Sequence, residues 1–504
     1  MNTSSPERAT WTNRWAFILV TIGSSVGLGN IWRFPYIAGT QGGSAFVILY
    51  LFFVLLIGIP LLMAETLIGR RGRGNPVISM LKVAEESNRS PWWGLVGWLG
   101  TIGALLILGY YSVVSGWIVD YFWKMLIGER FETQAAAEAG FTALQANPGE
   151  LILCHTLFML LTIGVVARGV VSGIERANRV MMPALFLILL CLTLWGGIAG
   201  DMPQAIHFMF AFKPKAIDQE VVLSALGHAF FSLSLGMGVI IAYGSYFKQG
   251  ASITHASFWV AMAGILVGLL AGLAIFSLTF AHGLKPGSGP GLILQTLPLT
   301  FAHMPGGRVF GLFFFLLVIF AAWTSAISLL EPFTAWLNER AGFTRMYAAF
   351  CGGAFSWLLG IGVCFSFNLW SDYRWFGKNL FELLDYWSTC IAMPVSGIAV
   401  AIFVGWIIKR EVAREEIALP PRMFTVWQAI LRYVVPFAIL LIFAHNLGLL
   451  AYWNTRIVVP ITGVAAAIYI SQRLKREQET VWQLLLRYLV PLTILLICAY
   501  SLLE

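Results

Sequence analysis

Long runs of apolar residues recur from one end of this 504-residue chain to the other. Runs such as 43–63 and 309–330 are continuous, whereas the strands of a membrane barrel alternate apolar and polar positions. A helix needs about 20 mostly apolar residues to cross a bilayer. The pattern therefore predicts an all-α polytopic membrane protein with eleven to thirteen helices, at 11–37, 42–70, 91–126, 151–167, 177–199, 221–247, 254–281, 309–340, 346–364, 378–408, 424–449, 457–472 and 480–502.

Two of these helices, 11–37 and 221–247, carry glycines and small polar residues in the middle of the span. Glycine costs about 1 kcal/mol relative to alanine in a helix, so such clusters favour an unwound stretch. Lipid cannot satisfy the backbone groups that unwinding frees, and these groups must instead line a cavity. Freed carbonyls bind small cations, and the N-termini of half-helices attract carboxylates. The alternative is that the glycines only allow close helix packing.

The two broken helices lie five helices apart, which is typical of transporters built from inverted repeats. We expect a ten-helix core over 1–410, with one five-helix repeat at about 11–199 and the other at about 221–408. About three accessory helices follow in 411–504, where the segment 426–436 recurs in part as 481–491. We interpret this duplication as a repeated lipid-facing helix.

The composition is that of a chain covered by lipid. Hydrophobic residues make up 59% of the chain and charged residues 11%, whereas a soluble domain has about 25% charged residues. The net charge of +8 does not indicate a nucleic-acid partner. With the N-terminus in the cytoplasm, the predicted inner loops hold about twice as many Lys and Arg residues as the outer loops. This bias predicts the orientation of the protein in its membrane.

The sequence contains no motif that indicates an enzyme. It has no HExxH motif, no phosphate-binding loop and no paired nucleophile and base. Its six cysteines are scattered and form no CxxC pair, so we predict neither a disulfide nor a cysteine metal site. A membrane enzyme is therefore excluded in favour of a transporter or a binding protein.

Several motifs follow one another in a fixed order along the chain. They are Gly27-Leu28-Gly29-Asn30-Ile31-Trp32-Arg33-Phe34-Pro35, Gly42-Gly43-Ser44-Ala45-Phe46, Gly58-Ile59-Pro60, residues 230–238, Gly289-Pro290-Gly291, Thr324-Ser325 and Asp385-Tyr386-Trp387. Over about residues 8–410 this order resembles the neurotransmitter:sodium symporter family, in its prokaryotic amino-acid carrier branch. The resemblance implies sodium-coupled secondary active symport of a neutral aliphatic or aromatic amino acid by alternating access. It also implies a multi-pass protein of the plasma membrane, which is the inner membrane of a prokaryote.

The resemblance implies a second sodium site between two helices. Its ligands would be the carbonyls of Gly23, Val26 and Ala321 with the hydroxyls of Thr324 and Ser325. All five are oxygen atoms, which suit a hard cation. Adjacent hydroxyl residues in a helix otherwise bond to their own carbonyls one turn back.

The resemblance also implies a first sodium site. It would use the carbonyl of Ser25, the amide oxygen of Asn30, Ser232 and the carboxylate of the substrate. Two positions depart from the family here. Gly264 stands where Asn or Asp is usual, and Gly268 stands where chloride-independent members usually carry an acid. These departures remove an ion ligand and a buried negative charge.

His228 is a further departure, because the family usually has Gln at this position. Histidine is neutral or charged near pH 7. One hypothesis is that His228 takes part in chloride or proton coupling. The other is that it is a neutral packing residue, hydrogen-bonded to a neighbour.

The substrate site implied by the resemblance has a polar and an apolar part. Tyr111 matches the family tyrosine whose hydroxyl binds the substrate carboxylate, and the N–H groups of Leu28 and Gly29 would bind the same group. Gly27 occupies the position that is Asp in monoamine carriers, so the substrate is expected to bring its own carboxylate. The pocket for the substrate side chain would be formed by Ile107, Tyr110, Phe231, Ser232, Ser234, Met237, Ser328 and Leu329. Methionine adapts its shape, so Met237 favours a range of substrates.

The gates also follow from the resemblance. Arg33 and Asp385 match the outer ion pair, with Tyr111 and Phe231 as an aromatic lid. The residues that match the inner gate are Arg8, Trp11, Ser245, Tyr246 and Glu339. Glu65 lies in an apolar run, and because an acid within the membrane is costly to bury, its presence there indicates a functional role. We expect Glu65 to stabilise the unwound part of the first helix and its neighbours.

Two alternatives stay open. The first is a proton- or chloride-linked amino-acid carrier of the same fold that uses His228. The second is an amino-acid sensor that binds without transporting. The identity of the amino acid, the ion stoichiometry and the oligomeric state do not follow from the sequence.

Overall fold

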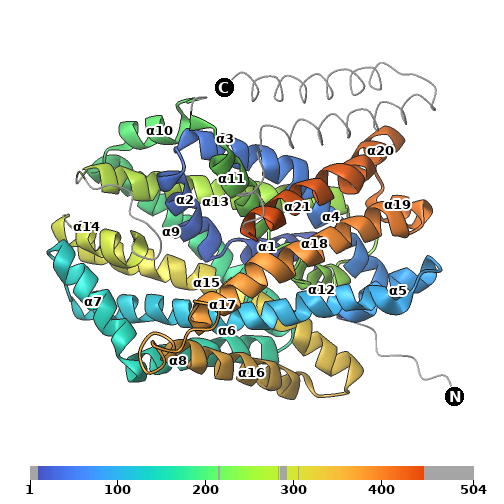
Figure 1. Ribbon diagram of the computed structural model, residues 1–504, viewed down its shortest axis with the longest axis horizontal. Helices are drawn as coiled ribbons and strands as arrows, with labels where there is room; N and C mark the ends of the chain where they lie inside the picture. Colours follow the sequence, from blue (N-terminus) through green and yellow to red (C-terminus); the bar gives the residue numbers. More distant parts are fainter. Residues whose placement is uncertain (1–8, 214–215, 282, 284–291, 305, 448–504) are drawn as a thin grey trace. The chain divides into compact units, whose positions relative to one another are not determined.

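The computed structural model describes residues 9–213, 216–281, 283, 292–304 and 306–447 (Figure 1). These residues form helices and loops, with one isolated bridge between Trp375 and Lys378. Within them, nine helices are long and apolar enough to cross a membrane, or ten if a bent N-terminal pair is one span. The prediction of an all-α polytopic membrane protein is confirmed. The predicted helices 457–472 and 480–502, and the second copy of the duplicated segment, lie outside the described residues.

The first five predicted helices follow in the expected order, although the fifth begins earlier than predicted. The Asn13 side chain caps the first of them by accepting a hydrogen bond from the N–H of Ala16 at 2.8 Å. The elements are α1 (Arg14–Ser25), η1 (Gly29–Arg33) and α2 (Phe34–Thr40); α3 (Ser44–Phe53), η2 (Val54–Gly58) and α4 (Ile59–Gly72); α6 (Gly94–Ile127); α8 (Pro148–Ala167); and η4 (Val170–Glu175) with α9 (Arg176–Ala199).

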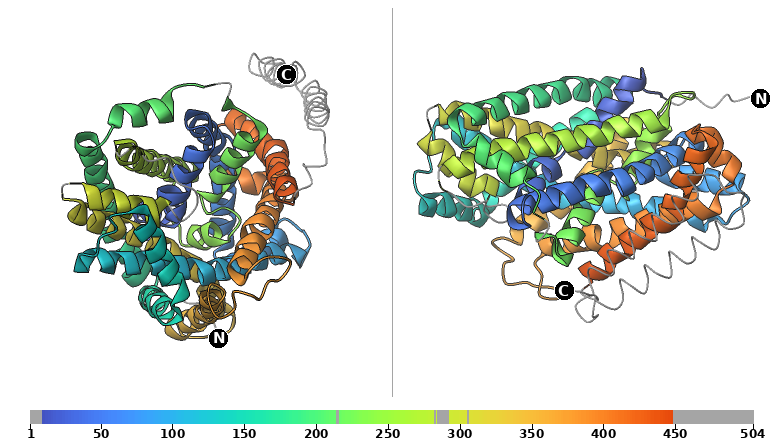
Figure 2. Two further views of the ribbon diagram at one scale, coloured as in Figure 1. Left: turned by 60° about the vertical axis from the view of Figure 1, so that its left-hand side comes forward. Right: turned by 90° about the horizontal axis from the view of Figure 1, so that it is seen from above.

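The next five predicted helices repeat this pattern. The elements are α11 (Gln219–Phe231) and α12 (Val239–Ser245); α13 (Ile253–Ala281); α15 (Gly307–Arg340); α16 (Arg345–Phe365); and α17 (Leu380–Asp385), η7 (Tyr386–Ala392), α18 (Met393–Ile402) and η8 (Phe403–Ile407). In both halves the first helix is broken, as the glycine clusters predict. Figure 2 looks along the bundle in its left panel, where the blue α1 and the light green α12 lie among the surrounding helices.

Shorter helices connect the spans. They are α5 (Pro76–Glu86), η3 (Pro91–Trp93), α7 (Gln134–Ala146), α10 (Met202–Phe210), η6 (Leu292–Thr296), α14 (Leu297–His303) and α19 (Arg410–Ile417). The last described span consists of α20 (Pro421–Ala429), η9 (Ile430–Val434) and α21 (Val435–Asn446). By internal contacts the chain divides into Met1–Ile439 and Leu440–Glu504. The first unit contains both predicted five-helix repeats, and the boundary at 410 between core and accessory helices stays a prediction.

The two breaks have different backbone forms. The first helix bends by 55° between Arg14–Ser25 and Gly29–Thr40. The second turns through the left-handed region at Ser234, Gly236 and Gly238, with φ angles of 55°, 77° and 70°. Glycine adopts such angles readily, whereas they strain a serine. The Ser234 hydroxyl donates to the carbonyl of Ser24 at 3.0 Å and so joins the two breaks to each other.

Candidate functional site

A cavity of about 40 Å³ lies where the two breaks meet α6 and α15. Its walls come from both broken helices, which confirms that their unwound parts line a common space. The lining residues are Ser24, Ser25, Gly27, Leu28, Gly29, Asn30, Ile107, Tyr111, Phe231, Ser232, Ser234, Met237, Ser325, Ser328 and Leu329.

One part of this cavity is polar. The backbone N–H of Leu28 donates to the Tyr111 hydroxyl at 3.3 Å, so the phenol lies at the break in the first helix. A Cβ atom added to Gly27 would lie 2.5 Å from Ser325 Oγ and 3.0 Å from the Tyr111 hydroxyl oxygen. Only a glycine lets these two hydroxyls approach the backbone so closely. The lining residues of the cavity include no acid.

The rest of the cavity is mostly apolar, with side chains from Ile107, Phe231, Met237 and Leu329. Ile107 lies one helical turn before Tyr111 and therefore faces the same way.

Tyr110 is a correction to the predicted pocket, because it does not line the cavity. Its ring instead lies 5.6 Å from that of Phe381, and its hydroxyl is 3.5 Å from Ser388 Oγ. One step along a helix turns the side chain by roughly 100°. Tyr110 therefore points away from the face that carries Tyr111.

The residues predicted for the second sodium site are brought together where α1 ends against α15. The Ser325 hydroxyl donates to the carbonyl of Gly23 at 3.3 Å. The Thr324 hydroxyl donates to the carbonyl of Ala321 at 3.1 Å. A hydroxyl that donates its one proton keeps two lone pairs, which can bind a cation. The backbone leaves the helix at Val26, with φ −88° and ψ 87°.

The residues predicted for the first sodium site surround Asn30. Its amide nitrogen donates to the carbonyl of Gly264 at 3.0 Å, while Oδ1 has no hydrogen-bond partner among the described residues. The hydroxyls of Ser25 and Ser232 are buried nearby, and Tyr50 donates to Ser232 at 3.3 Å. A Cβ added to Gly264 would be 3.5 Å from the Asn30 amide nitrogen, which is an ordinary contact. There is therefore room for a side chain at position 264.

His228 lies in an aromatic environment. Its ring centroid is 5.2 Å from that of Tyr50 and 5.8 Å from those of Phe34 and Phe46. The side chain is buried, and neither ring nitrogen has a hydrogen-bond partner in the described part of the chain. The hydrogen bond expected of a packing histidine is thus not found there.

Glu65 binds a neighbour of the first break, namely the unwound part of the second broken helix. Its Oε1 accepts a hydrogen bond of 2.7 Å from the N–H of Gly236, in the unwound part of the second broken helix. This partner belongs to the second broken helix and not to the first. The reason is that α4 packs along α12, where the left-handed turn at Gly236 exposes an N–H that a carboxylate can satisfy.

The predicted outer gate is not closed by an ion pair. Within the described residues no ion pair joins Arg33 to Asp385, and the Arg33 guanidinium lies 4.7 Å from the centroid of the Phe231 ring. Arg33 is exposed, and Phe231 and Tyr111 are half-buried. The cavity is therefore not sealed on the Arg33 side.

The opposite end of the broken helices is closed. Trp11 is fully buried, its N–H donates to the carbonyl of Tyr246 at 3.0 Å, and its indole N–H donates to the carbonyl of Tyr243 at 3.0 Å. Ser245 is also buried, and Glu339 accepts from the backbone and the side chain of Asn75 at 2.8 and 3.0 Å. Arg8 lies outside the described residues.

Sequence reasoning missed a buried acid at this closed end. Glu331 accepts a hydrogen bond of 2.7 Å from the Tyr246 hydroxyl and forms an ion pair with Arg345. An acid inside the apolar run 309–340 was the signal that could have found it. A second residue missed was Ser24, whose hydroxyl donates to Ser328 at 3.0 Å in the cavity wall.

Comparison with known proteins identifies the family. The model of the sodium:neurotransmitter symporter family matches residues 8–135 and 136–471. The chain belongs to the sodium:neurotransmitter symporter family. This family member is therefore a sodium-dependent transporter and a multi-pass membrane protein, and the prediction that it is not an enzyme is confirmed.

Relatives of this family member are found in bacteria and in mammals. It is 35% identical over 451 residues to YhdH of Bacillus subtilis (strain 168), an uncharacterized sodium-dependent transporter, and the match covers 88% of this chain and 98% of the relative. It is 31% identical over 301 residues to the sodium-dependent neutral amino acid transporter SLC6A17 of Mus musculus, covering 54% and 41%. The crystal structure of MhsT in complex with L-phenylalanine matches with a TM-score of 0.79 and 37% identity, covering 87% of this chain and all of that one.

Proposed function

We propose that this sodium-dependent transporter is a symporter of neutral amino acids, either aliphatic or aromatic, that works by alternating access. The observation that carries the proposal is the cavity at the two breaks, which has donors at one end, apolar side chains around the rest and no acid in its lining.

The polar end fits a carboxylate. The Leu28 N–H and the Tyr111 hydroxyl already lie 3.3 Å apart, and both can donate to one anionic group. Because Gly27 has no side chain, the hydroxyls of Ser325 and Tyr111 can approach the backbone at this break. A substrate carboxylate bound by these groups would meet the N-terminal end of a half-helix, where negative charge is stabilised.

The apolar part fits an uncharged side chain. Burial of an unpaired charge beside Ile107, Phe231 and Met237 would be costly, whereas an aliphatic or aromatic group gains about 25 cal/mol per Å² of buried apolar surface. The names of two similar proteins point the same way, since one is bound to L-phenylalanine and the other is called a neutral amino acid transporter.

Sodium would enter as a co-transported ion at the second site, on the oxygens of Gly23, Val26, Ala321, Thr324 and Ser325. This site would tie the break in the first helix to α15. We propose that the buried Trp11 closes the cytoplasmic end while Arg33 and Asp385, which no ion pair joins within the described residues, leave the outer end open. The excess of Lys and Arg in the inner loops supports a cytoplasmic N-terminus in a plasma membrane.

The test is uptake of labelled neutral amino acids into proteoliposomes under a sodium gradient alone and under a proton gradient alone. We expect accumulation with sodium, and its loss in the double variant Thr324→Ala with Ser325→Ala. Accumulation with protons alone would contradict sodium coupling. Binding without any accumulation would favour the sensor.

A second candidate is coupling to protons or chloride through His228. It is favoured by the two buried ring nitrogens, for which no partner exists among the described residues. His228→Gln restores the residue that the family usually carries. If this variant keeps the pH and chloride dependence of uptake, His228 is only a packing residue.

A further inference from the structure

Asn178 is a buried amide that the predicted sites do not use. It is 1% exposed and lies in the first turn of α9, within the span Val170–Ala199. Its amide nitrogen donates to the carbonyl of Ile174 at 2.9 Å, one turn back along the same segment. Oδ1 has no hydrogen-bond partner in the part of the chain that the structure describes.

An unpartnered carbonyl oxygen inside a membrane protein needs an explanation. A buried acceptor without a donor costs about 1–3 kcal/mol. Thr193, further along the same helix, also donates to a carbonyl one turn back, that of Leu189, at 2.8 Å. Asn178 uses its donor in the same way, but its amide carries in addition an acceptor, which this hydrogen bond leaves without a partner among the described residues.

The free oxygen is directed at Gly23. A Cβ added to Gly23 would lie 1.9 Å from Asn178 Oδ1 and 3.2 Å from the Cβ of Thr324. The oxygen and the Thr324 side chain thus flank the same glycine. Any side chain at position 23 would displace the amide, so the glycine provides the room in which Asn178 approaches α1.

Gly23 and Thr324, the two residues that meet this oxygen, both belong to the predicted second sodium site. The carbonyl of Gly23 is 3.3 Å from Ser325 Oγ, and Thr324 Oγ1 lies beside the carbonyl of Ala321 at 3.1 Å. These ligands come only from α1 and α15. A hard cation prefers oxygen ligands such as hydroxyls, carbonyls and side-chain amides.

We propose that Asn178 supplies a further oxygen ligand to the second sodium site and so brings α9 into that site. The proposal rests on the sodium-coupled function proposed above. Sodium then satisfies the acceptor that the protein itself leaves without a donor, and it joins three helices rather than two. Because Asn178 is neutral, it adds a ligand without the cost of burying another charge.

The test measures equilibrium binding of ²²Na⁺ to the purified full-length chain, which does not require transport. Asn178→Leu keeps the size of the side chain and removes the oxygen, so we expect the sodium concentration for half-saturation to rise about tenfold. Asn178→Asp keeps an oxygen in place and adds a negative charge, so it should bind sodium more tightly than the wild type. The matched control is Ser356→Ala, which removes a buried hydroxyl that donates to the carbonyl of Leu105 at 3.0 Å on the α6–α16 side.

The outcomes separate this proposal from the proposed function. Unchanged ²²Na⁺ binding in Asn178→Leu overturns the Asn178 ligand and leaves sodium symport intact. Suppose that ²²Na⁺ binding is weakened in Asn178→Leu but not in Ser356→Ala, and that the wild type accumulates no amino acid. This result supports Asn178 as a sodium ligand and overturns symport. If Asn178→Leu does not yield monodisperse protein, Asn178→Asp decides: tighter binding than that of the wild type supports the proposal, and equal or weaker binding overturns it.

Discussion

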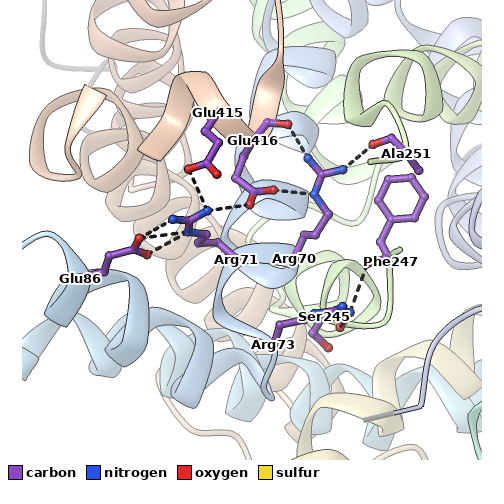
Figure 3. A network of polar contacts seen from close by, with 9 residues as sticks. All are labelled: Arg70, Arg71, Arg73, Glu86, Ser245, Phe247, Ala251, Glu415 and Glu416. Carbon is purple, nitrogen blue, oxygen red and sulfur yellow. Dashed lines mark hydrogen bonds and ion pairs between the residues drawn. The ribbon is translucent and has the colours of Figure 1, made fainter. Parts of the chain in front are cut away.

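Arg70 Nε lies 2.6 Å from Glu416 Oε2, although the two residues are 346 positions apart (Figure 3). Their side chains are 5% and 3% exposed. Arg70 also donates to the carbonyls of Ala251 and Glu416. One guanidinium therefore joins the end of α4 to α19 and to the loop between α12 and α13. The helix α19, which follows the predicted core, is fixed to the second broken helix region by this contact.

Loss of the Glu416 carboxylate should destabilise the protein strongly. Removing one partner of a buried ion pair leaves the other charge uncompensated and costs about 3–5 kcal/mol. We expect Glu416→Leu to lower the thermal melting midpoint of the detergent-solubilised protein. The matched control is Glu415→Leu, because Glu415 is 68% exposed and its pair with Arg71, at 3.1 Å, should contribute less than about 1 kcal/mol. Equal shifts in the two variants would contradict the structural role of the buried pair.

Glu86 should give the stability a pH dependence on the acid side. It ends α5, outside the spans, and hydrogen bonds from Arg71 hold its pKa below the ordinary value of 4.5. A carboxyl group with a lowered pKa stabilises the fold at pH values above 4.5, and this contribution is lost as the pH falls through the lowered pKa. As the pH is lowered through this range, the thermal melting midpoint should fall more steeply for the wild type than for Glu86→Gln. Parallel curves would show that the pair with Arg71 does not stabilise the fold.

The sequence could predict the two breaks because glycine clusters are a local signal, and most of the cavity because its residues match motifs of the family. Glycine clusters weaken a helix wherever they occur, and Ile107 and Tyr111 share a helix face by spacing alone. The role of Asn178 could not be predicted in this way. Its relation to Gly23 depends on how α9 packs against α1, and the sequence around Asn178, with Glu175, Arg176 and Arg179 beside it, does not indicate which helix it faces. The prediction that Tyr110 lines the cavity differs from the structure for the same reason. A pocket residue must face the cavity, and its position along the helix axis is not enough.

Gly27→Asp should abolish uptake of amino acids. Its Cβ would lie 2.5 Å from Ser325 Oγ, and its carboxylate would occupy the space proposed for that of the substrate. Two negative groups at one half-helix end would also repel each other. The control is Gly103→Ala in α6, where a Cβ would be 3.7 Å from the nearest atom and the fold has room for it. Uptake that survives in Gly27→Asp would place the substrate carboxylate elsewhere.

Gly264→Asn should strengthen sodium coupling at the first site. The Asn30 amide nitrogen is already held by the carbonyl of Gly264 at 3.0 Å, which leaves Asn30 Oδ1 facing the cavity region without a partner among the described residues. A Cβ at position 264 makes only ordinary contacts, at 3.5 Å from Asn30 and 4.0 Å from Leu233, so a side chain can begin there without a clash. The added oxygen supplies the ligand that this chain lacks relative to its family.

We therefore expect Gly264→Asn to lower the sodium concentration for half-maximal uptake and to make its sodium dependence steeper. Gly264→Ala is the control, because it fills the same room without adding an oxygen. If both variants change sodium dependence equally, the effect comes from packing against Asn30 rather than from coordination. If neither changes it, the glycine at position 264 does not limit the first sodium site, and the oxygens of Ser25, Asn30 and Ser232 with the substrate carboxylate are sufficient to bind the ion.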